Sequence, residues 1–212
     1  LTLSLPSQDE ITQKCLDNGV IPDPMAIYHS IEALNLTISD RLKPDLEEIY
    51  EKYTLNEEYK PDATQSAYRA LRNRALSFLA YQDSAYLAKI QANGAQNMTD
   101  QLSAFSIVIK HNPNSEHIEL FYDQWRHERL VIDKWFSAQV LTAHPNSLNK
   151  VVENLTTHSD FTITTPNRVR SILGAFSANT AGFHLETGEN YKLFSDWILK
   201  IDPVNPQVAA RM

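Results

Sequence analysis

A chain of 212 residues, of which 42% are hydrophobic, is long enough to bury a core as one large domain or two small ones. Its formal net charge of −7 argues against nucleic acid as the main partner, because phosphate binding requires a basic surface. No run approaches the ~18 apolar residues of a membrane-spanning helix, and the single cysteine, Cys15, fits a reducing compartment. We therefore expect a cytoplasmic protein that has neither nucleic acid nor membrane as a partner.

Glycine is scarce, at 5 of 212 residues, and apolar residues recur at helical spacing almost throughout. Tight β-hairpins use glycine for positive φ angles, so this composition favours helices joined by Pro, Asn and Asp turns. The one stretch with strand-like alternation, Phe161 to Thr164, is too short to form a sheet and is expected to be extended loop. The pattern predicts an all-α fold of about ten helices, arranged as an α-solenoid or an irregular helical array.

The first helices are predicted to begin at proline or at a capping side chain. Pro24 and Pro44 stand where early helices can begin, because proline suits the first helical position. Asp62 and Gln65 have the spacing of an N-cap and its capping-box partner. The apolar stripe behind them consists of Tyr68, Leu71, Ala75, Phe78 and Leu79.

The later part of the chain continues this pattern. Asn97 with Asp100, then Ser115, and then Pro166 with Thr165 before it as a possible cap, mark further helix starts. Other apolar stripes run over residues 131–140 and 191–198. The tryptophans that lie on apolar stripes, and that we expect to be largely buried, are Trp125, Trp135 and Trp197.

Candidate catalytic motifs are weak. The segment HERLV, His127 to Val131, resembles the zinc motif H-E-x-x-H, but Val131 stands where the second imidazole is required. We therefore predict no metal site in this chain and expect His127 and Glu128 to face solvent or to lie at a helix end. A nucleophile elbow, a Walker A loop and a G-x-G-x-x-G motif are also absent from the sequence. Cys15 is predicted to be a small buried or half-buried side chain.

Several arginines need an explanation. Arg69, Arg72 and Arg74 surround one helix and are interpreted as a solvated or ion-paired face, with a nucleic-acid patch as the minor alternative. Arg168 and Arg170 fall in the first turn of a helix, where cations oppose the helix dipole and usually have another role.

The last residues, NPQVAARM, predict a final short helix. Asn205 is a good N-cap and Pro206 suits the first helical position. Gln207 and Arg211 then have i, i+4 spacing, and the simplest interpretation of that spacing alone is an exposed polar face.

Several segments, in order along the chain, resemble the C-terminal region of bacterial aminopeptidases N, zinc enzymes of the M1 family. They are LRNRALSFLA, QNMTDQLSAFS, LVIDKWFSAQ, FTITTPNRVRSILGAF and NPQVAAR. The resemblance extends from about SLPSQDEI to the last residue. It implies a superhelical array of antiparallel helix pairs of the ARM/HEAT type, with irregular repeats, that closes over a catalytic domain and forms a substrate chamber.

The resemblance also implies roles for three residues and for the parent protein. Family members remove N-terminal residues from peptides with a zinc held in an upstream catalytic domain, whose motifs are absent from these 212 residues. The positions that match chamber-lining residues are Arg170, Gln207 and Arg211. Residues 1–212 are thus expected to be a single helical domain and a piece of a larger C-terminal domain, without catalysis or cofactor of its own. Its expected partners are the remainder of the aminopeptidase and peptide substrates.

A free-standing helical-repeat interaction module is the alternative. Such a module is expected to end in a polar capping helix, and NPQVAARM does not have that character.

Overall fold

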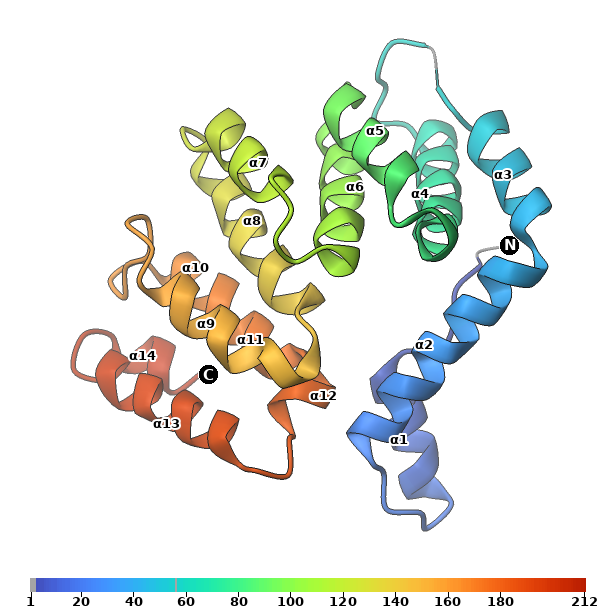
Figure 1. The fold of residues 1–212 in the computed structure, drawn as a ribbon. Helices are drawn as coiled ribbons and strands as arrows, with labels where there is room; N and C mark the ends of the chain where they lie inside the picture. The colour runs from blue at the N-terminus through green and yellow to red at the C-terminus, as the bar shows by residue number, and fades with distance from the viewer. Residues whose placement is uncertain (1–2, 56) are drawn as a thin grey trace. The chain divides into compact units, whose positions relative to one another are not determined.

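The computed structural model describes residues 3–55 and 57–212, and within them it is helical, with no strand (Figure 1). This confirms the predicted all-α class. The elements are α1 (Gln8–Asp17), α2 (Pro24–Arg41), α3 (Lys43–Lys52), α4 (Ala63–Asp83), α5 (Tyr86–Gly94), α6 (Met98–His111), α7 (His117–Trp125), α8 (Arg129–Thr142), η1 (Pro145–Ser147), α9 (Leu148–Thr156), α10 (Pro166–Val169), η2 (Arg170–Gly174), α11 (Ala175–Ala178), α12 (Thr180–Phe183), α13 (Glu189–Ile201) and α14 (Pro206–Ala209).

The chain divides into two compact units. Unit 1 contains the described residues up to Ile11 together with His29–Glu119, and unit 2 contains Thr12–Tyr28 and Leu120–Met212. The single domain expected over residues 1–212 stays a prediction. Residues 161–164 form loop and turn, as expected, and Cys15 is half-buried.

Unit 1 is built around α4, which packs against α3, α5 and α6. Asp62 caps this helix as predicted, since its carboxylate accepts from the Gln65 backbone N–H at 2.8 Å. The Gln65 side chain does not return the bond to Asp62, and accepts instead from the backbone N–H of Lys60. Small residues allow α4, α5 and α6 to approach closely; the buried alanines of this core are Ala80, Ala85, Ala88, Ala92 and Ala104.

A half-buried polar triad joins α2 to α4 and α6 in unit 1. Lys110 Nζ lies 2.8 Å from Glu32 Oε1 and 2.7 Å from the Tyr81 hydroxyl, which itself donates to Glu32 Oε2. Burial, together with the Glu32 carboxylate, raises the pKa of Tyr81. His111 stands edge-on to the Tyr81 ring, and burial followed by the charge of Lys110 lowers its pKa.

Unit 2 buries the apolar faces of α8, α9, η2 and α11 against one another. The fully buried side chains of this core include Ile132, Phe136, Val140, Leu148, Val152, Ile172, Leu173 and Phe176. Trp135 belongs to the same core and is 2% exposed, as predicted, on helix α8.

Trp125 and Trp197 are less buried than Trp135 and have an intermediate exposure. Trp125 is the last residue of α7, where the chain leaves the helix. Trp197 meets Phe161 edge-on, while Lys200 covers its ring with Nζ 4.4 Å from the centroid. A long cationic side chain on the same helix thus covers part of a ring that the apolar stripe alone would assign to the core.

Gly182 of α12 lies close against Leu148 of α9. A Cβ atom there would lie 2.6 Å from Leu148 Cδ2 and 3.1 Å from Leu148 Cβ, and Leu148 is fully buried. Asn190 Nδ2 also donates to the Gly182 carbonyl at 2.7 Å, which fixes α13 against the same turn.

Replacing Gly182 by Ala should therefore destabilise the chain by about 1–3 kcal/mol, because the fully buried Leu148 would have to shift within a packed core. The matched control is Gly94→Ala at the end of α5, where a new Cβ meets nothing within 4 Å. Since that residue does not occupy the left-handed region, its replacement should leave stability unchanged or raise it by ~0.5 kcal/mol. Urea unfolding of both variants, followed by circular dichroism, tests this, and equal midpoints would contradict it.

A second prediction concerns pH. Because the pKa values of His111 and His117 are lowered in the folded state, mainly by burial, protonation favours the unfolded chain. The stability from this source is present above the unfolded pKa of about 6.5 and is lost as pH falls below it. His111→Phe keeps the ring but cannot titrate, so its unfolding midpoint should fall less steeply between about pH 7 and 5. His127→Phe, at an exposed histidine, is the control for the replacement itself.

Candidate functional site

Arg170 lies at the start of a π-helical turn in unit 2. The turn, η2, interrupts an otherwise α-helical run between α10 and α11. Turns of this kind widen the helix by one residue and often occur at functional sites. Ser137 of α8 donates to the Ser171 carbonyl at 2.9 Å, so a side chain from a neighbouring helix supports the irregular backbone. The Arg170 side chain is exposed, with Nη1 3.4 Å from Asn167 Oδ1.

Arg168, two residues earlier, has a structural role. Its Nε donates to Asp133 Oδ1 at 2.6 Å and its Nη1 to the Asp160 carbonyl at 2.7 Å, while the guanidinium covers the ring of Phe136. These contacts compensate the unfavourable interaction of a cation with the dipole at the start of a helix. The cap expected from Thr165 is wrong: this residue occupies the N-cap position, but its side chain makes no cap hydrogen bond.

Gln207 and Arg211 lie at the end of unit 2. Asn205 caps α14 as predicted, with its side chain accepting from the Val208 backbone N–H at 3.1 Å. Val208 and Ala209 are buried, whereas Gln207 and Arg211 are exposed. Arg211 lies two residues beyond the end of α14, and its backbone N–H donates to the Val208 carbonyl in a turn. Within the described residues, no hydrogen bond joins Gln207, Arg211 and Arg170.

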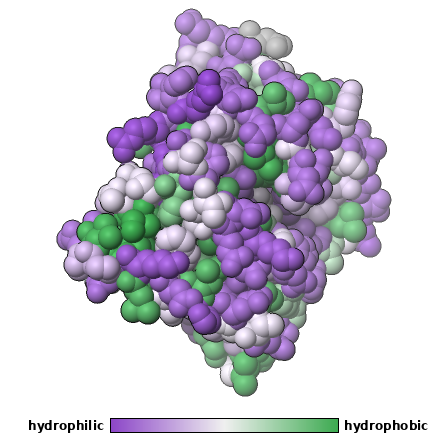
Figure 2. Space-filling model, turned by 60° about the vertical axis from the view of Figure 1, so that its left-hand side comes forward, coloured by the Kyte–Doolittle hydropathy of each residue, from purple (hydrophilic) through white to green (hydrophobic). Residues whose placement is uncertain are grey.

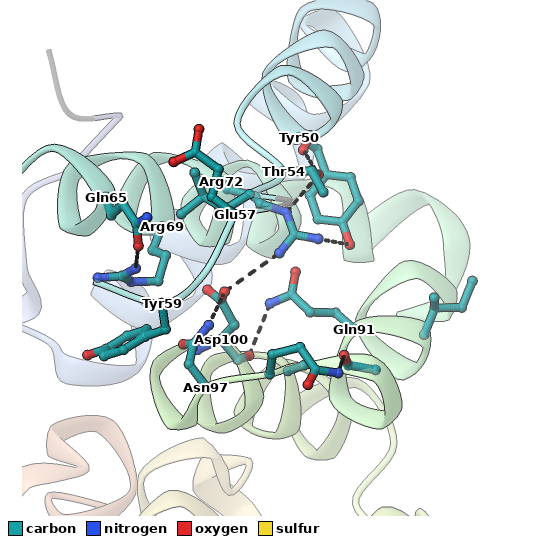
Figure 3. Close-up of a pocket in the computed structure, with 15 residues that line it drawn as sticks. Tyr50, Thr54, Glu57, Tyr59, Gln65, Arg69, Arg72, Gln91, Asn97 and Asp100 are labelled. Atoms are coloured by element: carbon teal, nitrogen blue, oxygen red, sulfur yellow. Dashed lines mark hydrogen bonds and ion pairs between the residues drawn. The ribbon is translucent and has the colours of Figure 1, made fainter. Parts of the chain in front are cut away.

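A polar cavity of about 420 Å³ in unit 1 was not anticipated from the sequence (Figure 3). It is bordered by the end of α3, the segment before α4, the first half of α4, and the facing ends of α5 and α6. Its buried polar wall consists of Gln65, Arg69, Gln91 and Asp100, and its more open rim includes Glu57, Tyr59, Ile90 and Gln96. The available signal was the spacing of Gln65, Arg69 and Arg72 on one helix face.

Asp100 is the centre of this wall. Its two carboxylate oxygens accept from Asn73 Nδ2 at 2.7 Å and Asn97 Nδ2 at 2.9 Å, and Arg72 Nη1 lies 3.9 Å from Oδ2. Asp100 also lies in the first turn of α6, where the helix dipole favours a carboxylate. Gln91 donates to the Asp100 carbonyl oxygen and to Asn73.

The interpretation of Arg69, Arg72 and Arg74 as a solvated or ion-paired face is confirmed for Arg72, which pairs with Asp100 at 3.9 Å, and is wrong for Arg69. Arg69 is 3% exposed and bonds to the neutral groups Gln65, Ser66 and the Lys60 carbonyl. Arg72 bonds to Thr54 and to the Tyr50 hydroxyl. Arg74 donates to the Leu3 carbonyl and covers the Phe78 ring. Aromatic faces and carbonyl oxygens accommodate these cations in place of water.

His127 and Glu128 are exposed and precede α8, as expected. Over residues 3–55 and 57–212, no group of three or more His, Cys, Asp or Glu side chains could hold a metal ion. In the same residues, every helix is too short or too polar to cross a membrane.

Comparison with known proteins gives consistent matches. A family model described as a domain of unknown function, DUF3458_C, with ARM repeats, matches residues 1–212. A crystal structure of Legionella pneumophila aminopeptidase A in complex with aspartic acid is similar with a TM-score of 0.86 and 27% identity, over 99% of this chain and 26% of that one. The ARM-like architecture that the sequence resemblance implied is thereby confirmed.

Bacterial proteins named aminopeptidase N are similar over nearly the whole chain. That of Escherichia coli K12 is 37% identical over 99% of this chain and 24% of its own length. Those of Caulobacter vibrioides and Haemophilus influenzae are 34% and 33% identical over 100% of this chain and 25% and 24% of their own lengths. The chain spans about a quarter of these curated relatives and corresponds to their C-terminal helical domain.

The two neighbouring arginines of unit 2 should respond differently to the same replacement. Arg168→Met leaves Asp133 without its cation and should cost about 3 kcal/mol, the scale for removing one partner of a buried ion pair. Arg170→Met removes an exposed guanidinium and should change the free energy of unfolding by less than about 0.5 kcal/mol. Chemical denaturation of both variants checks this, and an equal loss in both would show that Arg170 also supports the fold.

Proposed function

The chain belongs to the DUF3458_C family of ARM repeats, and from this membership we propose that it is the chamber-closing domain of a cytoplasmic zinc aminopeptidase of the M1 family. One observation carries the proposal: a single match to proteins named aminopeptidase N runs through essentially every residue of the chain. In the intact protein, a separate catalytic domain would hold the zinc, which supplies an activated water for hydrolysis of the first peptide bond. This chain would supply walls and polar contacts.

Arg170, Gln207 and Arg211 are the residues proposed to face the substrate. All three are exposed, polar and largely unused by the packing of unit 2, in contrast to Arg168. A guanidinium presents planar N–H donors that suit peptide carbonyls or a terminal carboxylate. An arginine at the start of a π-turn supported by Ser137 would be held on a defined backbone, which favours a positioning role for Arg170.

Unit 2 has exposed apolar side chains that the proposed partner domain could bury. Ile21, Leu130 and Leu199 are 91%, 69% and 72% exposed. Figure 2 shows that apolar residues on the face in view form separate patches between hydrophilic ones. Covering such side chains in a longer protein would be favourable, by about 25 cal/mol for each Å² removed from water.

The experiment uses the intact protein that contains this chain. It should hold stoichiometric zinc by elemental analysis and release the first residue from aminoacyl amides, and chelation should abolish the activity. The 212-residue chain alone should hold no stoichiometric zinc and hydrolyse no aminoacyl amide. An intact protein that neither binds zinc nor cleaves peptides would leave the interaction-module alternative in place.

Arg211→Ala in the intact protein tests the proposed chamber role. The variant should change kcat/KM toward peptides by an amount that corresponds to roughly 1–3 kcal/mol of transition-state free energy, the scale for lost charged hydrogen bonds. Its zinc content should not change. Arg126→Ala, at another exposed arginine of unit 2, is the control. Kinetics indistinguishable from those of the control over several peptides of different length would contradict the assignment.

A further inference from the structure

The cavity of unit 1 has the construction of a binding site, with a buried polar wall and an open rim. Its volume of about 420 Å³ lies in the range of small-molecule sites. The Arg69, Gln91 and Asp100 side chains are each more than nine-tenths buried, and they come from three different helices. In Figure 3 the side chains of Arg72, Gln91 and Asp100 point toward one another. Polar and charged side chains, whose burial costs desolvation free energy, are thus concentrated in the wall of this cavity.

Two of these groups have hydrogen-bonding capacity that the fold does not use. Gln91 Oε1 is buried and, among the described residues, accepts no hydrogen bond, although Gln91 Nε2 donates twice. Arg72 uses Nε for Thr54 and Nη2 for the Tyr50 hydroxyl, while Nη1 is 3.9 Å from Asp100 Oδ2, beyond hydrogen-bond distance. A buried acceptor without a donor is uncommon in folded proteins and points to a missing group.

The charges around the cavity select the kind of ligand. The cations Arg69 and Arg72 are matched in number by the carboxylates Glu57 and Asp100. An anion bound at Arg72 would face the Asp100 carboxylate, and a cation bound at Asp100 would face Arg72. A neutral ligand that carries both an acceptor and a donor avoids both repulsions.

We propose that this cavity binds an uncharged peptide segment through its main chain. A peptide carbonyl would accept from Arg72 Nη1, and a peptide N–H would donate to Gln91 Oε1, so that one main chain uses both unused groups. The Tyr50 and Tyr59 rings, which already lie against the guanidinium groups of Arg72 and Arg69, would flank the segment. Leu55 and Ile90 at the border would contact an apolar side chain.

The site is independent of the proposed function, because its residues belong to unit 1 and the proposed chamber residues to unit 2. A probe that is N-acetylated has no free amino terminus for an aminopeptidase to remove. Loss of peptidase activity in the intact protein and loss of peptide binding here are therefore separate results.

The test is a titration of the ¹⁵N-labelled 212-residue chain with N-acetyl-Ala-Leu-Ala-amide, observed by NMR. We expect saturable shifts of the Gln91 side-chain amide and the Arg72 Nε–H signals. We also expect intermolecular contacts from the peptide to the ring protons of Tyr50 or Tyr59. Parallel titrations with acetate and inorganic phosphate should leave these signals unchanged.

The matched variants are Arg72→Gln and Arg41→Gln, which remove one positive charge inside and outside the cavity of the same unit. Arg72→Gln should weaken peptide binding at least about tenfold, while Arg41→Gln, at an exposed residue, should leave it unchanged. If Arg72→Gln lowers the thermal unfolding midpoint, its effect on binding is not interpreted. The intermolecular NMR contacts between the peptide and the rings of Tyr50 or Tyr59 in the wild-type chain then decide whether the peptide binds in the cavity.

Three results would overturn the proposal. The first is the absence of saturable shifts at peptide concentrations on the order of 10 mM. The second is a response to acetate or phosphate in place of the capped peptide, which would show an anion site. The third is peptide binding that both variants retain equally.

Discussion

The ion pair between Arg168 and Asp133 holds together the part of unit 2 on which its candidate site depends. At 2.6 Å and largely out of solvent, it joins the turn before η2 to the middle of α8, and the Asp160 carbonyl shares the same guanidinium. Such a pair offsets its desolvation only with good geometry and further hydrogen bonds, and both are present. Because Arg170 is two residues away on the same helical run, its backbone position follows from this anchor.

Unit 1 uses the same physical solution around a different centre. Asp100 is buried at the start of α6, where two asparagine amides satisfy its oxygens and the helix dipole favours its charge. Arg72 is near enough for attraction but makes its hydrogen bonds to Thr54 and Tyr50. A helical array has few backbone groups to offer between helices, so side chains must satisfy buried polar groups. The cavity lies where this network leaves acceptors and donors unused.

Features that depend on residues close in the chain, such as helix caps, could be predicted from the sequence. Features that depend on contacts between distant residues could not. The caps at Asp62, Asn97 and Asn205 are confirmed, because a capping side chain bonds to a backbone N–H only three residues away. The partner of Arg74 could not be predicted, because the Leu3 carbonyl lies 71 residues away in the chain. The cavity was missed for the same reason, since residues of α3, α4, α5 and α6 line it.

The contrast between Arg168 and Arg170 shows how structure divides roles that sequence spacing cannot. Both were predicted in the first turn of one helix, where a cation is unfavourable without compensation. The fold compensates Arg168 with a carboxylate, a carbonyl and an aromatic face, and leaves Arg170 exposed beside a backbone irregularity that Ser137 supports. A residue that occupies an electrostatically unfavourable position, and whose side chain is not used in packing, is a candidate for contact with a ligand. The proposed role of Arg170 in contact with substrate rests on this exposure together with the resemblance to aminopeptidase N.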